Sequence, residues 1–356
     1  MRIADFFIVA LGLLLFYSCS NSEKSDKIVY LTEEDLPPVQ PIEFEKIDLP
    51  EDECMDSYYY VYHDSVLVTM HRTPDPYWLT IMNLNSKEVL SNYIIKGNGP
   101  EEMIFCYNSL RDNRLIVSDP RQVRMKIFNL DSIMQLNKTY NPQMYYQDNS
   151  EYKNVDVLTD TSFVFYNRWY FDNCSKEANS GIPELIVTGK DAKFTYNPPA
   201  EATIDGYISN TYIFTNLDRQ RTFIAYACKP QFTILNSSLD TIKIVCGPEP
   251  VEIVDNGKLE RYFSGEFVNE YIGLSFSTKN YIFAINSRIH NVFRKDLKEA
   301  RKNNPELFKF DWDGNVVARY KIGECYNLSG FSETTNTLYV TKFDEDGELC
   351  LYKAQL

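Results

Sequence analysis

Residues 111–131, RDNRLIVSDPRQVRMKIFNLD, contain the structural unit that the rest of the chain repeats with variations. The β-branched run at 115–117 follows the turn signal Asp112-Asn113, and the alternating run at 125–130 ends at Asp131-Ser132. Short runs of this kind, bounded by turn residues, predict two strands of a hairpin. Because one hairpin cannot bury its apolar face alone, copies of it must stack beside one another.

Turn signals flanked by apolar runs recur every 48 to 61 residues from about residue 60 to the C-terminus. Each is a short cluster of polar residues of the kind that ends one strand and begins the next. Six such signals predict six repeated units. They are His63-Asp64-Ser65, Asp112-Asn113, Thr159-Asp160-Thr161, Asp218-Arg219-Gln220, Thr278-Lys279-Asn280 and Thr334-Thr335-Asn336.

A second series of turns lies between the first, after the third strand of each unit. Residues 307–322, LFKFDWDGNVVARYKI, show it most clearly, because the Asp-Gly hairpin signal at 313–314 separates two alternating runs. Corresponding turns begin at Asn83, Asn129, Thr188 and Asn236. Each unit is therefore predicted to contain four strands.

The sixth unit is one strand short, because residues 327–332, 337–343 and 348–356 supply three strands before the chain ends. Residues 42–49, IEFEKIDL, alternate like a half-buried strand and have no hairpin partner nearby. This spare strand can complete the last unit and close the ring without exposed sheet edges. The sequence thus predicts an all-β, six-bladed propeller of four-stranded blades over residues 42–356, closed by the N-terminal strand.

The repeats resemble six-bladed propellers of the NHL type, and more closely the TolB-like six-bladed propeller lipoproteins of Bacteroidetes. Residues 115–130 are similar to the NHL pattern of apolar strand, Asp, polar turn, Arg and apolar strand. KGNGPEEM at 96–103 looks like the Gly-x-Gly-Pro-x-Glu stretch that follows the first blade in the TolB-like group. The resemblance covers about residues 40–356. Since its motifs are structural, it implies the fold and carries little about function.

The N-terminus predicts export and a lipid anchor. An apolar run at 6–17 is too short to span a bilayer comfortably and suits a secretory signal. Ser18-Cys19 at its end resembles a bacterial lipobox, and the alternatives are an ordinary cleaved signal or an anchor in which the Cys is there by chance. We therefore expect a signal peptide at 1–18, lipidation of Cys19 with attachment to the outer membrane, and a polar tether at 19–41.

Composition excludes several classes of function. The 356 residues include 14% aromatics and carry a formal net charge of −14, which disfavours a nucleic-acid partner. Seven cysteines follow Cys19 without close pairs, so a structural zinc site is not expected. The three histidines show no HExxH spacing, and no GxSxG nucleophile elbow is present. The sequence therefore predicts no catalytic residues, no metal and no cofactor.

A candidate ligand site comes from cations that directly follow the second strand of each unit, one of them Lys342 in the last unit. If these lie on one face of the ring, they can bind a carboxylate or an acidic glycan, with nearby aromatics stacking on sugar rings. The alternative is that they pair with acids such as Glu101, Glu102 and Asp119. The predicted ligand-binding residues are Arg72, Trp78, Arg121, Arg124, Arg168, Trp169, Lys229, Arg288 and His290.

The largest departure from the repeat is the basic stretch at 288–305, whose spacing at Val292, Leu297 and Ala300 predicts a helical insertion. It is either a short solvated helix or a lid or partner site.

Taken together, these features predict a non-catalytic ligand- or protein-binding propeller at the cell envelope, with a glycan, a peptide or an envelope protein as partner. Two alternatives stay open. One is an enzyme acting on a saccharide or a lactone, and the other is a scaffold subunit of an outer-membrane complex.

Overall fold

The structure is a computed structural model of the 356-residue chain. It describes residues 27–50, 57–71, 76–111, 113–119, 121–136, 141–146, 152–159, 162–167, 185–189, 193–196, 211–226, 231–247, 267–268, 272–286, 292–293, 305–323 and 327–356.

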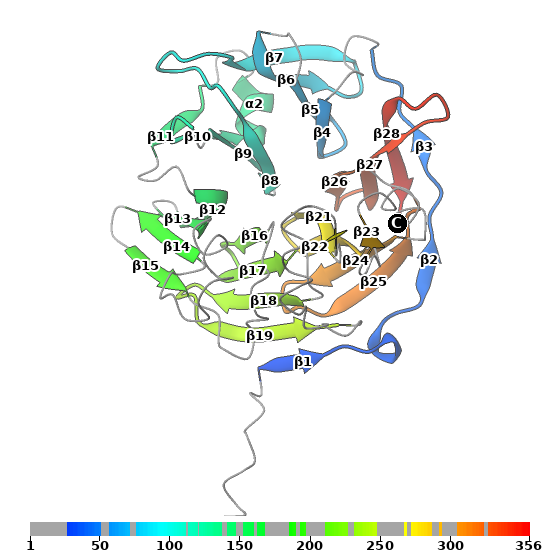
Figure 1. The fold of residues 1–356 in the computed structure, drawn as a ribbon. Helices are drawn as coiled ribbons and strands as arrows, with labels where there is room; N and C mark the ends of the chain where they lie inside the picture. The colour runs from blue at the N-terminus through cyan, green and yellow to red at the C-terminus, as the bar shows by residue number, and fades with distance from the viewer. Residues whose placement is uncertain are drawn as a thin grey trace, which may run out of the picture.

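Six four-stranded antiparallel units form the blades of a ring (Figure 1), and the units of blades 2 and 5 are joined into one nine-stranded sheet through β8 and β21. Blade 1 consists of β4 (Ser57–Tyr62), β5 (Val66–His71), β6 (Tyr77–Asn83) and β7 (Glu88–Ile95). Blade 2 consists of β8 (Tyr107–Arg111), β9 (Arg114–Asp119), β10 (Arg124–Asn129) and β11 (Gln143–Tyr146). Blade 3 consists of β12 (Tyr152–Thr159), β13 (Ser162–Asn167), β14 (Leu185–Gly189) and β15 (Lys193–Tyr196).

Blade 4 consists of β16 (Thr211–Asn216), β17 (Arg221–Tyr226), β18 (Gln231–Asn236) and β19 (Thr241–Cys246). Blade 5 consists of β21 (Ile272–Ser277), β22 (Tyr281–Asn286), β24 (Glu306–Asp311) and β25 (Val316–Lys321). Blade 6 consists of β26 (Asn327–Ser332), β27 (Thr337–Phe343), β28 (Leu349–Gln355) and β3 (Glu45–Lys46). The all-β propeller is confirmed, and all six first turns lie where the sequence predicts them.

Alternation along the strands explains how neighbouring blades stack. In the repeat unit, β9 and β10 pair antiparallel, with Ile127 opposite Ile116. Leu115 and Val117 are fully buried in a cluster shared with blade 1, whereas Ile116 faces the other way and packs near Val157 of blade 3. Because successive side chains point to opposite faces of a sheet, one strand contributes to two inter-blade cores.

The N-terminal segment runs along the outer edges of blades 4, 5 and 6 (Figure 1). β1 (Ile28–Tyr30) pairs parallel with β19, and β2 (Val39–Pro41) pairs parallel with β25. A 3-10 turn, η1 (Glu33–Asp35), separates them. The structure here differs from the expected tether at 19–41, because residues 27–41 are held by strand pairing and by burial of Leu36 between blades 4 and 5.

The fourth strand of blade 6 comes from the N-terminal segment, as β3 pairs antiparallel with β28. Lys46 lies opposite Tyr352, and the Ile47 amide donates to the Leu351 carbonyl at 2.8 Å. This strand is shorter than the predicted 42–49. The residues around it still bury apolar side chains, since Phe44 packs against the core between blades 5 and 6.

Two local predictions differ from the structure. The predicted turn at Asn129 is instead followed by α2 (Leu130–Leu136), because the Asn129 side chain accepts the Ser132 amide and Leu130 and Ile133 are both buried. Within the predicted helical insertion at 288–305, β23 (Val292–Phe293) pairs with β20 (Phe267–Val268), as β-branched and aromatic residues favour. Apart from Pro305, the rest of that insertion lies outside the described residues. None of the described helices has the length and apolarity needed to cross a membrane.

Candidate ligand-binding pocket

The two ends of the ring carry different connections. Because neighbouring strands of a blade are antiparallel, all turns between first and second strands lie at one end, here called the turn end. The connections between second and third strands lie at the opposite end, here called the loop end. The predicted ligand-binding residues that the structure describes, Trp78, Arg121 and Arg124, belong to the loop end, whereas the described pockets lie at the turn end.

The innermost strand of blade 2 reaches across the ring to blade 5. β8 pairs parallel with β21, with Arg111 opposite Ser277. Pockets of about 340 and 200 Å³ are lined by residues of the blades on either side of this pairing, and both are lined by Ser277, Thr278 and Lys279. The larger one, here called the Arg114 pocket, is of the size that small-molecule sites occupy.

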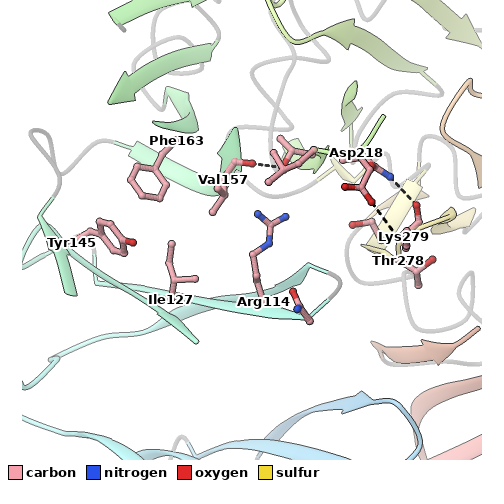
Figure 2. Close-up of a pocket in the computed structure, with 13 residues that line it drawn as sticks. Arg114, Ile127, Tyr145, Val157, Phe163, Asp218, Thr278 and Lys279 are labelled. Atoms are coloured by element: carbon pink, nitrogen blue, oxygen red, sulfur yellow. Dashed lines mark hydrogen bonds and ion pairs between the residues drawn. The ribbon is translucent and has the colours of Figure 1, made fainter. Parts of the chain in front are cut away.

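The Arg114 pocket has an apolar end and a polar end (Figure 2). Blades 2 and 3 supply the apolar end, which is lined by Ile127, Tyr145, Val157 and Phe163. Blades 4 and 5 supply the polar end, which is lined by Thr215, Asn216, Asp218, Ser277, Thr278 and Lys279. Asn113 and Arg114 enter from the first turn of blade 2, and Figure 2 shows the Arg114 side chain between Val157 and Asp218.

Aromatic and aliphatic side chains make the apolar end a wall. The rings of Tyr145 and Phe163 meet edge to face, with centroids 4.9 Å apart. Behind them, Ile116 and Met125 are almost fully buried in the same cluster as Val157. The wall is therefore continuous with the core between blades 2 and 3.

Most of the polar side chains at the polar end of the Arg114 pocket already form hydrogen bonds with other groups of the protein. The Thr215 hydroxyl donates to the Val157 carbonyl, and the Asn216 amide donates to the Lys279 carbonyl at 2.8 Å. The Thr278 hydroxyl donates to Glu333, which also accepts the Asn280 backbone amide at 2.8 Å. These bonds fix the turns of blades 4, 5 and 6 against one another.

Among the residues that the structure describes, the charges around the pocket leave one cation in excess. Beneath the pocket, Arg111 lies 3.5 Å from Asp156, and both side chains are buried. Burial raises the pKa of Asp156, and the guanidinium groups of Arg111 and Arg114 oppose that rise. At the mouth, Lys279 pairs with Asp218 at 3.3 Å. Among the described residues, the guanidinium of Arg114 makes no hydrogen bond or ion pair within the protein.

An unpaired, half-buried guanidinium beside an apolar wall is suited to binding an anion. Guanidinium groups recognise carboxylates and phosphates through two parallel hydrogen bonds. Partial exclusion of water strengthens such a contact relative to the same contact at the surface. The geometry therefore supports binding of an anionic ligand, with Arg114 as the anchoring residue.

The smaller pocket lies between blades 1, 5 and 6. Tyr62 and His63 of blade 1 line it together with Phe276, Phe331 and Glu333. Because the Glu333 carboxylate is occupied by Thr278 and Asn280, it serves to hold the blade 5 turn. This pocket offers no excess cation comparable to Arg114.

At the loop end, two predicted ligand-binding residues hold the GNGPEE loop. The Arg124 guanidinium donates to the carbonyls of Gly99 at 2.5 Å and Glu102 at 3.0 Å. The Trp78 indole donates to the next carbonyl, that of Met103, at 2.8 Å. Arg124 therefore bonds to backbone carbonyls, a role that neither the ligand-binding interpretation nor the acid-pairing alternative anticipates.

Of the three acids expected to pair with the cations, Glu101 pairs with Lys126 at 3.0 Å, whereas Asp119 and Glu102 bond to the backbone. The Asp119 carboxylate is fully buried and accepts four amides, those of Ile104, Phe105, Arg121 and Gln122. Glu102 accepts the Gly99 amide at 2.7 Å. The exposed Arg121 guanidinium lies over the Phe105 ring at 5.6 Å.

In the last blade, Lys342 lies over the ring of Phe44 at 4.6 Å. The remaining predicted site residues, Arg72, Arg168, Trp169, Lys229, Arg288 and His290, lie outside the described residues, as does Cys19.

Sequence reasoning missed Arg114, although it lies in the repeat unit quoted first. It is the residue directly after the first turn of blade 2, whereas the cations predicted to bind a ligand follow the second strands. The sequence does mark Arg114 as unusual, because it is a charged residue directly before the apolar run Leu115-Ile116-Val117. Charged residues in such positions are seldom left without a partner or a function.

The described residues contain no cluster of three or more metal-ligating side chains. The described cysteines Cys106, Cys246 and Cys350 are not joined in disulfides, and burial raises the pKa of Cys106. The predictions of no metal and no cofactor stay predictions, because much of the loop end is outside the described residues.

Fold and pocket together define a six-bladed β-propeller with a ligand-sized pocket at the turn end. A family model described as TolB-like 6-blade propeller-like matches residues 53–328. The chain belongs to this TolB-like family, as the sequence resemblance predicted. No curated protein sequence matches the chain.

Two solved structures of Bacteroides proteins share the fold. A Bacteroides fragilis protein described as exported is 12% identical, with a TM-score of 0.55 over 92% of this chain and 99% of that one. A DUF4221 family member from Bacteroides vulgatus is 10% identical, with a TM-score of 0.55 over 88% of this chain and 98% of that one. At these identities the likeness shows the propeller fold alone.

Proposed function

We propose that this protein is an exported, lipid-anchored propeller that binds a small anionic ligand in the Arg114 pocket and does not transform it. The observation that carries the proposal is the guanidinium of Arg114, which lies in a pocket without an acceptor among the described residues. In a chain of net charge −14, a cation in a pocket without a hydrogen-bonded acid among the described residues favours a ligand that supplies a negative charge.

The proposal of export is supported by the N-terminal sequence and by a related fold. The apolar run at 6–17 followed by Cys19 has the order of a lipoprotein signal. A solved structure with the same fold comes from a Bacteroides fragilis protein described as exported. Attachment to the outer membrane through Cys19 is part of this proposal, and radiolabelled lipid incorporation lost in Cys19→Ala tests it.

A thermal-shift screen tests the binding function. A ligand that binds only the folded state raises the apparent stability by mass action. The panel contains small carboxylates, inorganic phosphate, sulfate and neutral sugars, each tested on the wild type, Arg114→Gln and Arg121→Gln. We expect an anion-dependent shift that Arg114→Gln removes and Arg121→Gln retains.

The two arginine variants also separate the two ends of the ring. A shift that survives Arg114→Gln but is lost in Arg121→Gln would place the site at the loop end, as the sequence analysis predicted, and would refute the Arg114 pocket. Shifts with neutral sugars that neither variant changes would refute an anion site altogether. Consumption of the ligand during the incubation would favour the enzyme alternative.

A further inference from the structure

We infer that the ligand of the Arg114 pocket is a small monocarboxylate with an apolar tail. This inference rests on the proposed function, because it takes Arg114 as the anchor for the carboxylate. Arg114 stands between the apolar and polar ends of the pocket, so the remainder of a bound molecule extends toward one of them (Figure 2). The chemistry of the two ends selects the direction.

The polar end has few hydrogen-bonding groups left for a ligand. Thr215 and Thr278 donate their hydroxyl hydrogen to the protein, and Asn216 uses one of the two N–H donors of its amide. The Asn113 amide is likewise bonded to Asp131 at 2.9 Å. An acidic sugar carries several hydroxyls, and each one that enters the pocket without a partner loses its bonds to water. The polar end therefore disfavours a glycan.

The apolar end offers the complementary surface. Ile127, Tyr145 and Phe163 are each half-buried and continue the core that Ile116, Met125 and Val157 form behind them. An apolar tail placed against this wall leaves water without giving up hydrogen bonds. Each methylene buried there tightens binding by about fourfold.

The charges limit the ligand to one anionic group. Both acids near Arg114 already have a cationic partner, since Asp156 pairs with Arg111 and is also attracted by Arg114, and Asp218 pairs with Lys279. One guanidinium in excess matches one carboxylate. A second carboxylate on the ligand would have to lie near Asp218 or enter the apolar end, and both positions are unfavourable.

Ligand-detected NMR on the purified protein tests the inference, because it measures weak binding of small acids. Acetate, butyrate and hexanoate form the chain-length series, with hexylamine as the cationic control and glucuronate as the acidic sugar. The variants are Arg114→Gln for the anchor and Ile127→Thr for the wall. Ile242→Thr, the same change at an exposed strand isoleucine distant from the pocket, is the matched control.

We expect affinity to rise about fourfold per methylene that enters the pocket, with hexylamine and glucuronate binding at least tenfold more weakly than hexanoate. Arg114→Gln should abolish binding of all three carboxylates. Ile127→Thr should reduce the gain in affinity per methylene, and Ile242→Thr should leave that gain unchanged.

The contrary outcomes are distinguishable. If carboxylates bind through Arg114 but affinity is independent of chain length, or glucuronate binds as tightly as hexanoate, the proposed function stands and the apolar-tail inference is refuted. If Arg114→Gln does not change the affinities for the carboxylates, or if no carboxylate binds, the proposed function and the apolar-tail inference are both refuted.

Discussion

Arg111 and Asp156 form a buried ion pair between the innermost strands of blades 2 and 3, with the guanidinium Nε 3.5 Å from the carboxylate Oδ2. The same Nε donates to the Ile213 carbonyl of blade 4 at 3.0 Å, and the guanidinium lies 4.3 Å above the Phe214 ring. Asp156 accepts the backbone amides of Val157 and Thr215, each at 2.7 Å. Three blades thus meet at one pair beneath the Arg114 pocket.

Removing one partner of this ion pair should lower the free energy of unfolding strongly. Arg111→Met leaves the Asp156 carboxylate buried without its counter-ion, and we expect a loss of about 3–5 kcal/mol in the free energy of unfolding. The measurement is urea denaturation followed by far-UV circular dichroism. The double variant Arg111→Met, Asp156→Asn should be less destabilised than Arg111→Met alone, because it no longer buries the charge of the Asp156 carboxylate.

The exposed pair Lys279–Asp218 is the control for that experiment. Its side chains are 65% and 70% exposed, so Asp218→Asn should change the free energy of unfolding by less than about 1 kcal/mol. Equal effects of Arg111→Met and Asp218→Asn would show that the central pair does not hold the blades together.

Arg124 should act on stability rather than on ligand binding. Its guanidinium donates to two carbonyls of the GNGPEE loop and to the Gln122 side chain at 3.1 Å. We expect Arg124→Gln to lower the free energy of unfolding by about 1–3 kcal/mol, because the carbonyls lose a charged donor. Arg121→Gln, which changes an exposed arginine three residues before Arg124, should cost less than about 1 kcal/mol. Thermal denaturation of both variants measures the difference. A larger loss of stability in Arg121→Gln than in Arg124→Gln would contradict the contacts described for Arg124.

Gly330 should not tolerate a side chain. It lies on β26 with a φ of +156°, and a Cβ there would stand 2.2 Å from the Val61 carbonyl oxygen of blade 1. We expect Gly330→Ala to destabilise the protein by more than about 2 kcal/mol through displacement of that backbone. Gly347→Ala is the control, since Gly347 has a φ of +81° but open space around it, and it should cost about 1 kcal/mol. Similar costs at both positions in chemical denaturation would indicate that blades 1 and 6 are not tightly apposed.

Attachment of the N-terminal segment to blade 6 should weaken in acid. The Lys46 ammonium lies 2.9 Å from Asp344 and, through that hydrogen bond, lowers the pKa of the Asp344 carboxyl from 3.8 to about 2. A carboxyl whose pKa is lower in the folded than in the unfolded state stabilises the fold above the unfolded value. The contribution is therefore complete above about pH 4 and disappears as the pH falls through about 2.

Melting temperatures of the wild type and Asp344→Asn between pH 2 and 6 test this dependence. We expect the difference between them to be constant above pH 4 and to vanish near pH 2. Glu45→Gln, which alters the exposed Glu45–Lys353 pair on the same two strands, is the control and should give a small difference. A difference for Asp344→Asn that persists undiminished at pH 2 would contradict the assignment.

The blades were predictable because their signals are local. Each first turn is a cluster of polar residues between apolar runs, and the alternation of Leu115, Ile116 and Val117 assigns each residue to one of two inter-blade cores. Local turn chemistry and a period of two carry this information without knowledge of distant residues.

The pocket was not predictable, because it depends on contacts between distant residues. Arg111 and Ser277 are opposite each other across the ring, and no sequence pattern indicates that two innermost strands pair there. The strands along blades 4 and 5 were missed for a different reason. β1 and β2 are three residues each in a polar, proline-containing segment, and their order comes from Leu36 and the edges that they cover.

The most direct test of the central claim is the dissociation constant of one small carboxylate, butyrate, for the wild type and for Arg114→Gln, by isothermal titration calorimetry at fixed pH and ionic strength. Loss of a charge-assisted contact predicts a weakening of about 10- to 100-fold. Equal dissociation constants for the two proteins would contradict the assignment of Arg114 as the anchor of the ligand.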